Sequence, residues 1–443
     1  MDCVVGIDLG STTTKAVVMG LDRVVLGRGI TNTRNNYQVA CAVARDEAFA
    51  AARFALVRQA LAAAPAGLGT DVTWCAALER GVRREQYVAQ LRRLIVALDE
   101  ALRSPVFTPR AAALRPAVAA ITEGMLAEAT ALFAEGARLK SDFFRDVAQS
   151  RYTRAAEAAA SAAAPFEWLV GCFDKAILAV ENAPPEDVFA RHLGAALTAA
   201  LDGTPDLPER ARRSLAALVR ESAELPLDAR HAVGTGYGRS TLPFPREQIR
   251  SEILCHGLGA HALFPATRTV LDIGGQDTKA IQVDGEGIVT SFQMNDRCAA
   301  GCGRYLGYIA DEMNLGLHEL GPLAQQSQLP VKISSTCTVF AGAEIRDRLT
   351  LGQSREDILA GLHRAIMLRA MSLLARSGGV SDEFTFTGGV AKNPAAVAAL
   401  RELVAENHGE RTINISPDSI YTGAIGAALF AVRAVRAPAG SAA

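Results

Sequence analysis

The pattern of hydrophobic and polar positions divides this chain into two kinds of sequence. Short runs rich in valine and isoleucine and bounded by glycine turns fill about residues 3–31, 230–239 and 268–294, and such runs predict strands. From about 40 to 225 the chain is rich in alanine and lacks strand alternation. One helical face there is formed by Tyr87, Leu91, Leu94, Ile95, Leu98 and Leu102. This spacing predicts an amphipathic helix, and we expect an insertion of several short helices.

Prolines mark the expected helix ends inside the insertion, because proline cannot donate an intrahelical hydrogen bond. The breaks fall at Ser104-Pro105, Pro165, Pro184-Pro185 and Thr204-Pro205. Beyond residue 294 the pattern alternates between helix and strand, which is typical of an α/β domain. Strands are expected at 383–387 and 412–416, and helices at 247–263, 298–313 and 342–377 and after Pro394 and Tyr421.

Two stretches repeat one strand-turn-strand pattern at a constant offset. In each, an apolar strand leads to an aspartate and a glycine turn, and a lysine follows seven positions after the aspartate. The first copy runs from Asp8 to Lys15, and the second from Asp272 to Lys279. A carboxylate at a strand end can hold Mg²⁺ through water, and glycines let backbone N–H groups approach phosphate oxygens. Lysine supplies a point charge for a β- or γ-phosphate.

Either copy alone could be a plain hairpin turn, because Asp and Gly also serve turn geometry without any ligand. Two copies at the same offset suggest instead two homologous lobes that face one nucleotide. The candidate catalytic residues are Asp8, Lys15, Asp272 and Gln276, with Gln276 chosen by chemical type to orient the attacking water. The candidate nucleotide-binding residues of the two turns are Gly10, Ser11, Thr12, Thr13, Gly274, Gly275, Asp277 and Lys279.

A third glycine motif follows the strand expected at 383–387. Gly388 and Gly389 lie between this strand and a helix, and Asn393 precedes the helix. A backbone without side chains could pack on a flat adenine or ribose. A simple strand-to-helix connection explains the same residues equally well, since glycine often marks such turns.

Length and charge narrow the class of protein. A chain of 443 residues exceeds what one core usually organises, so two or three domains are expected. The net charge of −1 gives no basic footprint for nucleic acid or an anionic membrane. No apolar run approaches the roughly 18 residues of a membrane helix. The eight cysteines are scattered rather than patterned as a disulfide framework, so a reducing cytoplasm is the expected compartment.

The three motifs, in this order, resemble those of the superfamily of acetate kinases, sugar kinases, heat-shock chaperones and actin. The resemblance implies an α/β fold of two ribonuclease-H-like lobes hinged around ATP and Mg²⁺, with the motif aspartates holding the metal through water. It implies lobe I at residues 1–34 and 226–266, a large helical insertion in lobe I at 35–225, and lobe II at 267–443.

Two cysteines lie in segments rich in glycine, serine or threonine that are expected to lead into helices. These are Cys298, within 294–304, and Cys337, within 334–341. A helix N-terminus stabilises a thiolate, the form that binds metal, although cysteine is also a common small core residue. Their separation of 39 positions fits neither a zinc finger nor a ferredoxin motif. Two thiolates cannot complete a four-ligand cluster, so a second subunit would have to provide the rest.

These segments, together with Thr235–Arg239, Cys255-His256 and Phe386–Asn393, resemble the ATP-dependent activators of 2-hydroxyacyl-CoA dehydratases and the ATPase subunits of benzoyl-CoA reductase. In that family two ATPase subunits share one 4Fe-4S cluster, and the resemblance maps its ligands onto Cys298 and Cys337. It implies that reduced ferredoxin supplies electrons, that ATP drives lobe closure, and that a catalytic partner holding the acyl-CoA accepts low-potential electrons.

The remaining cysteines carry less information. Cys302 stands where the motif usually has threonine, and packing, a hydrogen bond to the cluster and alternative ligation are all open for it. The cysteines without a companion motif, which we assign to structure, are Cys3, Cys41, Cys75, Cys172 and Cys255.

The insertion of nearly 200 residues is the feature by which we choose between a dehydratase activator and a benzoyl-CoA reductase subunit. It is absent from the compact activators and resembles the larger ATPase subunit of benzoyl-CoA reductase, so the sequence favours the reductase. A dehydratase activator is the nearest alternative. A small-molecule kinase of the same fold, which would not use Cys298 or Cys337, and a chaperone-like module, which would use the insertion on clients, are more distant.

Overall fold

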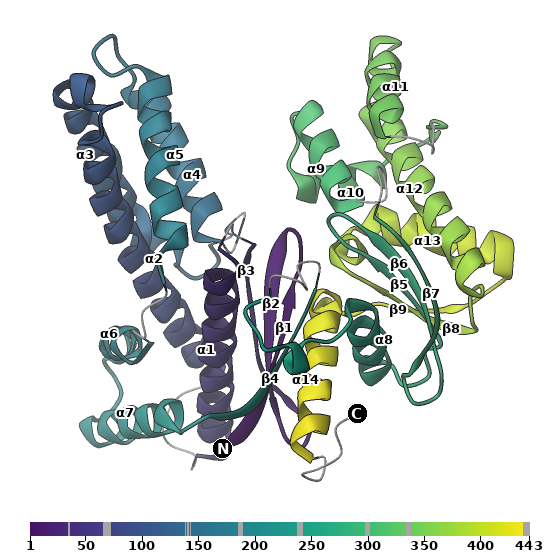
Figure 1. Ribbon diagram of the computed structural model, residues 1–443. Coiled ribbons are helices and arrows are strands. Elements are labelled where there is room, and N and C mark those ends of the chain that lie inside the picture. The colour runs from purple at the N-terminus through teal and green to yellow at the C-terminus, as the bar shows by residue number, and fades with distance from the viewer. Residues whose placement is uncertain are drawn as a thin grey trace. The chain divides into compact units, whose positions relative to one another are not determined.

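The computed structural model forms two compact units (Figure 1). Unit 1 contains Met1 and residues 34–226, and unit 2 contains residues 2–33 and 227–443. The described residues are 1–33, 36–64, 72–137, 139, 141, 143–184, 189–236, 242–296, 302–333 and 338–436.

Unit 1 is helical wherever regular structure is described. Its α-helices are α1 (Tyr37–Ala63), α2 (Val72–Leu102), α3 (Ala111–Leu132), α4 (Phe144–Ala159), α5 (Phe166–Asn182), α6 (Phe189–Asp202) and α7 (Glu209–Glu224). Helix boundaries fall at the prolines used to predict them, since α2 ends before Pro105, α5 begins after Pro165 and α6 ends before Pro205. The expectation of short helices was wrong for α1 and α2, which have 27 and 31 residues.

Helix α2 is long and runs beside the other helices of unit 1 (Figure 1). It takes part in two hydrophobic clusters. Its first half packs Trp74 and Leu78 with residues of α1, α6 and α7. Its second half packs Leu91 and Leu94 with residues of α3, α4 and α5. The apolar face predicted from Tyr87 to Leu102 is therefore core except for Ile95, which is half-buried. The helices of unit 1 pack around hydrophobic clusters of their own.

Unit 2 contains two sheets that share one strand order, β3-β2-β1-β4 in the first and β7-β6-β5-β8-β9 in the second. The strands are β1 (Asp2–Leu9), β2 (Thr13–Gly20), β3 (Val25–Asn32), β4 (Asp228–Gly236), β5 (Thr269–Ile273), β6 (Thr278–Val283), β7 (Val289–Asn295), β8 (Glu383–Thr387) and β9 (Thr412–Asn414). In both sheets three successive antiparallel strands are joined by a parallel strand that comes later in the chain.

This shared order is that of a ribonuclease-H-like lobe, and it confirms the predicted α/β fold with two such lobes. Where the second sheet has β9, the first has a single parallel bridge between Gly234 and Ile249. Each sheet therefore repeats the same topology, although the first is shorter by one strand within the described residues.

Helices α8 (Glu252–Leu263) and α14 (Thr422–Arg436) lie between the two sheets (Figure 1). Helix α14 comes from residues expected in lobe II, and it packs on β1 and β4 of the first sheet. Three close approaches rely on glycine: a Cβ on Gly6 would overlap the α14 backbone, one on Gly259 would overlap Thr422, and one on Gly426 would overlap Cys255. The absence of side chains there brings sheet and helices close together.

The second sheet is covered by helices that come after β7. These are α9 (Cys302–Glu312), α10 (Leu317–Ala324), α11 (Thr338–Thr350), α12 (Arg355–Ser377) and α13 (Pro394–His408), of which α10 was not predicted. Phe384 and Phe386 of β8 are fully buried in their core. Contrary to the sequence-based expectation, α12 is long and apolar enough to cross a membrane by length and composition, but 67% of that window is buried.

Candidate functional site

Each phosphate motif forms a strand pair in which its aspartate lies opposite its lysine. Asp8 pairs with Lys15 across β1 and β2, and Asp272 pairs with Lys279 across β5 and β6. Side chains of directly opposed residues in an antiparallel pair are neighbours. The seven-residue spacing is therefore the register of the hairpin, and it places a carboxylate beside an ammonium group in both copies.

The repeat continues into the parallel strand beside each aspartate. Asp8 lies opposite Thr235 of β4, and Asp272 lies opposite Thr387 of β8. The sequence did not predict that these two threonines lie beside the phosphate motifs. A parallel partner strand comes from a distant part of the chain, so local sequence patterns do not identify it.

A glycine follows each of these threonines for a steric reason. Gly236 and Gly388 have φ values of 119° and 86°. A Cβ on Gly236 would lie 2.3 Å from the carbonyl oxygen of Leu9, and one on Gly388 would lie 2.3 Å from that of Ile273. Both positions therefore require glycine, and the internal duplication includes a Thr-Gly pair next to each aspartate.

The two glycine turns approach each other. A Cβ built on Gly275 would lie 2.4 Å from Thr12 Oγ1 and 3.7 Å from Ser11 Oγ. Lys15 Nζ reaches over the first turn, 3.1 Å from the place of a Cβ on Gly10. The structure thus brings together candidate residues from both motifs. A bare backbone beside hydroxyl groups and an ammonium group suits the oxygens of a phosphate chain.

The two aspartates differ in their hydrogen-bond partners. Thr387 Oγ1 donates to Asp272 Oδ1 at 2.9 Å, while Lys279 Nζ lies 3.3 Å from Asp272 Oδ2. Asp8 is equally buried, but its Oδ1 has no hydrogen-bond partner within the described residues. Thr235, the counterpart of Thr387, donates to the carbonyl of Arg250 instead. One aspartate is therefore fixed by protein groups, and the other has a free oxygen.

Lys279 lies in a buried ion-pair network. Its Nζ is 2.7 Å from Asp277, 3.0 Å from Glu252 and 3.3 Å from Asp272, and the residue is 1% exposed. Burial alone would lower the pKa of Lys279, but these carboxylates outweigh it and raise that pKa. Its ammonium group is thus held by three carboxylates, whereas Lys15 Nζ lies 3.9 Å from Asp8.

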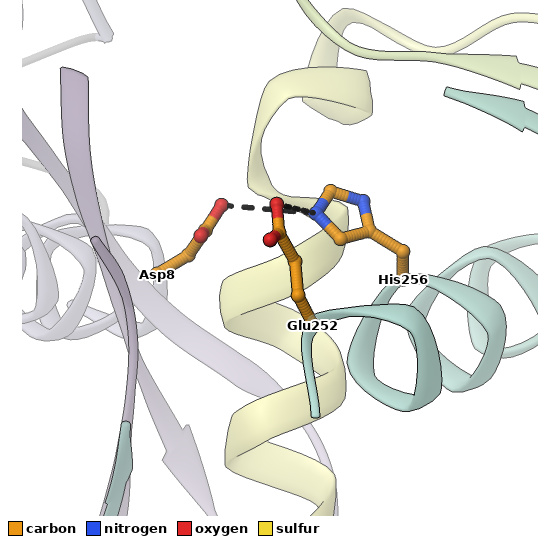
Figure 2. A group of neighbouring side chains, drawn as sticks. All are labelled: Asp8, Glu252 and His256. Atoms are coloured by element: carbon orange, nitrogen blue, oxygen red, sulfur yellow. Dashed lines mark ion pairs between the residues drawn. The ribbon is translucent and has the colours of Figure 1, made fainter. Parts of the chain in front are cut away.

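Figure 2 shows three side chains that converge at this place, Asp8 from β1 and Glu252 and His256 from α8. His256 Nε2 lies 4.0 Å from Asp8 Oδ2 and 3.9 Å from Glu252 Oε1, and one ligand atom from each residue falls within 4.8 Å of the others. Gly423 of α14 closes over them, because a Cβ there would lie 2.8 Å from both Asp8 Oδ2 and His256 Nε2.

The chemistry of Glu252 was not predicted from the sequence. Burial raises the pKa of Glu252, although Lys279 and His256 oppose the shift. For His256, burial would lower the pKa, but the charges of Asp272 and Asp8 outweigh burial and raise it. Glu252 and His256 are four residues apart on a helix that leads into the second motif. Residues with this spacing share one face of a helix, so the sequence could have predicted that the two side chains lie together.

In the third glycine motif, Asn393 has a structural role, whereas the backbone of Gly389 has space beside it. Asn393 Oδ1 accepts hydrogen bonds from the amides of Ala395 and Ala396 at the start of α13, and its Nδ2 lies 3.0 Å from His363 Nε2. Asn393 is therefore fully engaged as a helix cap. A Cβ on Gly389 would meet nothing within 4 Å, so this backbone stays open on one side. Gln276, in the second turn, is half-buried.

The two proposed cluster ligands, Cys298 and Cys337, lie outside the described residues, as does the side chain of Cys302. In the chain, α9 begins four residues after Cys298, and α11 begins directly after Cys337. The cysteines assigned to structure are buried and form no disulfide with one another: Cys3, Cys41, Cys75, Cys172 and Cys255. Burial raises the pKa of Cys172 to about 11 and that of Cys255 to about 12, so these thiols stay protonated near neutral pH.

Helices α9 and α11 touch and run in the same direction at their contact. A Cβ on Gly342 of α11 would lie 3.5 Å from the ring of Tyr308 of α9. One turn further along both helices, Arg346 Nη1 donates to Glu312 Oε2 at 3.0 Å. Because the contacts advance together, the chain enters both helices from the same side.

Comparison with known proteins agrees with this geometry. The model of the BadF/BadG/BcrA/BcrD ATPase family matches residues 5–431. The chain belongs to this ATPase family. A similar relative is the (R)-2-hydroxyglutaryl-CoA dehydratase activating ATPase of Acidaminococcus fermentans, 41% identical over 221 residues, which are 50% of this chain and 82% of the relative. A benzoyl-CoA reductase subunit of Thauera aromatica is 34% identical over 213 residues, 48% of this chain and 75% of the relative.

A solved structure supports the fold. The crystal structure of the (R)-2-hydroxyglutaryl-CoA dehydratase component A of A. fermentans matches with a TM-score of 0.54 and 22% identity, covering 99% of this chain and 100% of that one. Among these relatives the dehydratase activator is more similar in sequence than the reductase subunit. The comparisons therefore favour the alternative over the reductase assignment that the insertion suggested.

Proposed function

We propose that this chain is the ATP-hydrolysing electron activator of a 2-hydroxyacyl-CoA dehydratase. One observation carries the proposal: two phosphate hairpins face each other, and the second adjoins α9, which touches α11. The chain enters both helices from the same side, each directly after a cysteine-bearing segment. The 41% identity to an activating ATPase, against 34% to a reductase subunit, supports the dehydratase branch.

The residues of the first motif fit Mg²⁺ and ATP. Asp8 offers a buried carboxylate oxygen without a protein partner, and Mg²⁺ prefers oxygen ligands, many of them water. Bound Mg²⁺ would neutralise charge on the phosphates of ATP. Lys15 and the hydroxyls of Ser11 and Thr12 would bind phosphate oxygens, while Asp272, already held by Thr387, would fix the buried network.

Two residues are candidates to orient the water that attacks the γ-phosphate. Gln276 was proposed from its chemical type and lies in the second turn. Glu252 is the stronger candidate, because its carboxylate lies between Lys279 and His256, 3.0 Å and 3.9 Å away, and close to Asp8. Burial raises the pKa of Glu252, which makes its carboxylate a better proton acceptor.

Cys298 and Cys337 are the proposed ligands of a 4Fe-4S cluster shared with a second ATPase subunit. Such a cluster would supply a one-electron carrier of low potential. Lowering a one-electron potential by about 200 mV costs roughly 4.6 kcal/mol, an amount of the order that a nucleotide-driven conformational change can provide. Reduced ferredoxin is the proposed electron donor, and the dehydratase is the proposed acceptor.

A benzoyl-CoA reductase ATPase subunit is the second candidate. Unit 1 favours it, because an insertion of this size resembles the larger reductase subunit, and a reductase subunit is among the relatives. The two functions differ in energy use. An activator delivers an electron that its partner recycles through many turnovers, whereas a reductase module consumes ATP with every electron.

Anaerobic co-expression of the chain with its genomic neighbours tests the proposal. Iron, acid-labile sulfide and the EPR spectrum are measured for the wild type, Cys298→Ala, Cys337→Ala and the matched control Cys172→Ala. We expect about four irons per two ATPase subunits, lost in the first two variants and kept in the third. ATP consumed per product then separates activator from reductase. Iron-free wild type with normal ATP turnover would contradict the proposal and favour a kinase.

A further inference from the structure

His256 of α8 has carboxylates on both sides of its ring. Its Nδ1 lies 3.4 Å from Asp272 Oδ1. Its Nε2 lies 4.0 Å from Asp8 Oδ2 and 3.9 Å from Glu252 Oε1. Thr387 donates to the same oxygen of Asp272 at 2.9 Å, which fixes that carboxylate. In the neutral ring, Asp272 favours the proton on Nδ1, so that Nε2 presents its lone pair toward Asp8 and Glu252.

The distances on the Nε2 side are too long for hydrogen bonds and suit an ion between the side chains. A hydrogen bond between nitrogen and oxygen spans about 2.7–3.2 Å, whereas these separations are 3.9 and 4.0 Å. Two ligands of one divalent ion, with bonds of about 2.0–2.2 Å, lie roughly 3–4.3 Å apart. One ligand atom from each of the three residues falls within 4.8 Å of the others. A small closing movement of the side chains would therefore bring all three to one ion.

The charged groups around His256 are more negative than positive. They belong to Asp8, Glu252, Asp272, Asp277, Lys15 and Lys279. When all are ionised and His256 is neutral, four carboxylates against two ammonium groups leave a net charge of −2. Asp8, Asp272 and Lys279 are each at most 3% exposed. An unbalanced buried charge is costly, and a divalent cation would balance this one.

Gly423 of α14 keeps space beside the ligand atoms. A Cβ at this position would lie 2.8 Å from both Asp8 Oδ2 and His256 Nε2. Asp8 also has its second oxygen, Oδ1, without a hydrogen-bond partner in the part of the chain that the structure describes. The side chains in Figure 2 therefore meet at a buried position where neither a methyl group nor a hydrogen bond occupies the space between Asp8 and His256.

We propose that Asp8, Glu252 and His256 bind a divalent first-row transition-metal ion. Two carboxylate oxygens and one imidazole nitrogen suit such ions, and a metal-binding histidine usually has a carboxylate at its other nitrogen, as His256 has in Asp272. Mg²⁺ prefers oxygen ligands, so the histidine distinguishes this site from that of the Mg²⁺ that accompanies ATP. The ion would join β1 to α8. The site needs neither nucleotide nor an iron-sulfur cluster, so the inference does not rest on the proposed function.

Mn²⁺ is the probe, because it is paramagnetic and prefers oxygen and nitrogen ligands to thiolates. The full-length protein, purified anaerobically and treated with a chelator, is titrated with Mn²⁺ without nucleotide, and EPR measures the free ion. We expect one tightly bound Mn²⁺ per chain, with a Kd at least tenfold lower than that of Mg²⁺ measured by competition. Pulsed EPR of the bound ion should show coupling to ¹⁴N. The absence of bound Mn²⁺ or of nitrogen coupling, or equal affinity for Mg²⁺, would overturn the inference.

His256→Gln is then compared with the matched control His261→Gln on the same helix. We expect His256→Gln to weaken Mn²⁺ binding at least tenfold and to abolish the ¹⁴N coupling, whereas His261→Gln should match the wild type. Gly423→Ala places a methyl group beside two ligand atoms and should also weaken Mn²⁺ binding at least tenfold. Unchanged binding and nitrogen coupling in His256→Gln would assign the ion to another histidine and contradict the site. If His256→Gln does not fold, the wild-type spectrum and Gly423→Ala decide.

The inference and the proposed function fail in different ways. Three side chains bridged by water alone would bind no Mn²⁺, which the first titration detects. Protein that binds no Mn²⁺ without nucleotide but hydrolyses ATP with Mg²⁺ would overturn the transition-metal site and leave the ATPase assignment standing. Protein that binds Mn²⁺ through His256 but contains no iron would overturn the cluster assignment and leave this site standing.

Discussion

Thr387 holds Asp272 through a hydrogen bond of 2.9 Å, and this bond marks the difference between the two halves of an internal duplication. The equivalent threonine, Thr235, turns its hydroxyl to the carbonyl of Arg250, which leaves one oxygen of Asp8 without a partner among the described residues. Two aspartates that occupy the same register in the same topology therefore have different surroundings. We infer that Asp8 serves the metal and nucleotide, whereas Asp272 stabilises the charges around it.

Replacing each aspartate with asparagine separates these roles. Asp272→Asn leaves Lys279 and His256 short of a buried counter-charge, so we expect a loss of about 3–5 kcal/mol in the free energy of unfolding. Asp8→Asn should change that free energy by about 1 kcal/mol or less and reduce Mg²⁺-dependent ATP hydrolysis at least a hundredfold. Urea denaturation and a phosphate-release assay measure the two effects. Equal destabilisation by both substitutions, or normal hydrolysis in Asp8→Asn, would refute the division of roles.

The neighbouring glycines Gly388 and Gly389 should respond differently to alanine. Gly388 has a φ of 86°, and its Cβ would lie 2.3 Å from the Ile273 carbonyl, so Gly388→Ala is expected to destabilise the protein by about 1–3 kcal/mol or more. The methyl group added in Gly389→Ala would enter open space, so this variant should fold normally. If adenosine packs on this backbone, Gly389→Ala raises the Kd for ATP about tenfold, which equilibrium dialysis measures. An unchanged Kd would remove Gly389 from the nucleotide site.

Local sequence patterns were sufficient for much of the fold. The strand predicted at 383–387 is β8, Glu383–Thr387, because a short alternation of phenylalanine and threonine that ends at a glycine pair is typical of a strand. The paired motifs were predictable for the same reason, since the spacing from Asp8 to Lys15 is a property of one hairpin. Proline positions located the helix ends of unit 1, because the lost N–H acts locally.

Tertiary partners could not be predicted in this way. Lys15 and Lys279 occupy the same position in the two copies of the motif. Lys279, however, is buried against Glu252 of α8, which belongs to neither copy. The contact of α14 with β1 joins opposite ends of the chain. The reductase assignment depended on the insertion, which builds hydrophobic clusters of its own, whereas the sequence identities to relatives favour the dehydratase activator.

Glu252→Gln tests whether Glu252 orients the attacking water, a role that was not predicted from the sequence. The amide keeps a hydrogen-bond acceptor for Lys279 but cannot take a proton from water. We expect kcat for ATP hydrolysis to fall by about 10²–10⁴, with the Kd for ATP within threefold of wild type. Glu247→Gln, in the segment just before α8, is the matched control and should be silent. Single-turnover phosphate release gives the chemical step. If Gln276→Ala reproduces the loss and Glu252→Gln does not, Gln276 orients the water.

His363 makes the stability of unit 2 depend on pH. Its Nδ1 lies 2.7 Å from the carbonyl of Leu359, to which it donates, and its Nε2 accepts from Asn393, so the buried ring is neutral. Burial lowers the pKa of His363 below its ordinary value of 6.5, and the bond to Leu359 opposes this only in part.

The sign of the pH effect follows from proton uptake. The unfolded chain binds a proton at His363 as the pH falls through about 6.5, whereas the folded protein does not until the pH reaches the lower folded pKa. The stabilisation is complete above pH 6.5 and is lost below it, by at most about 1.4 kcal/mol per pH unit. Urea denaturation at pH 7.5, 6.5 and 5.5 measures this slope. Hydrogen exchange in β8 is the probe of unit 2, because both tryptophans, Trp74 and Trp168, lie in unit 1 and their fluorescence would report on that unit. His363→Gln should flatten the slope, and an identical slope in both proteins would assign the pH dependence to other groups.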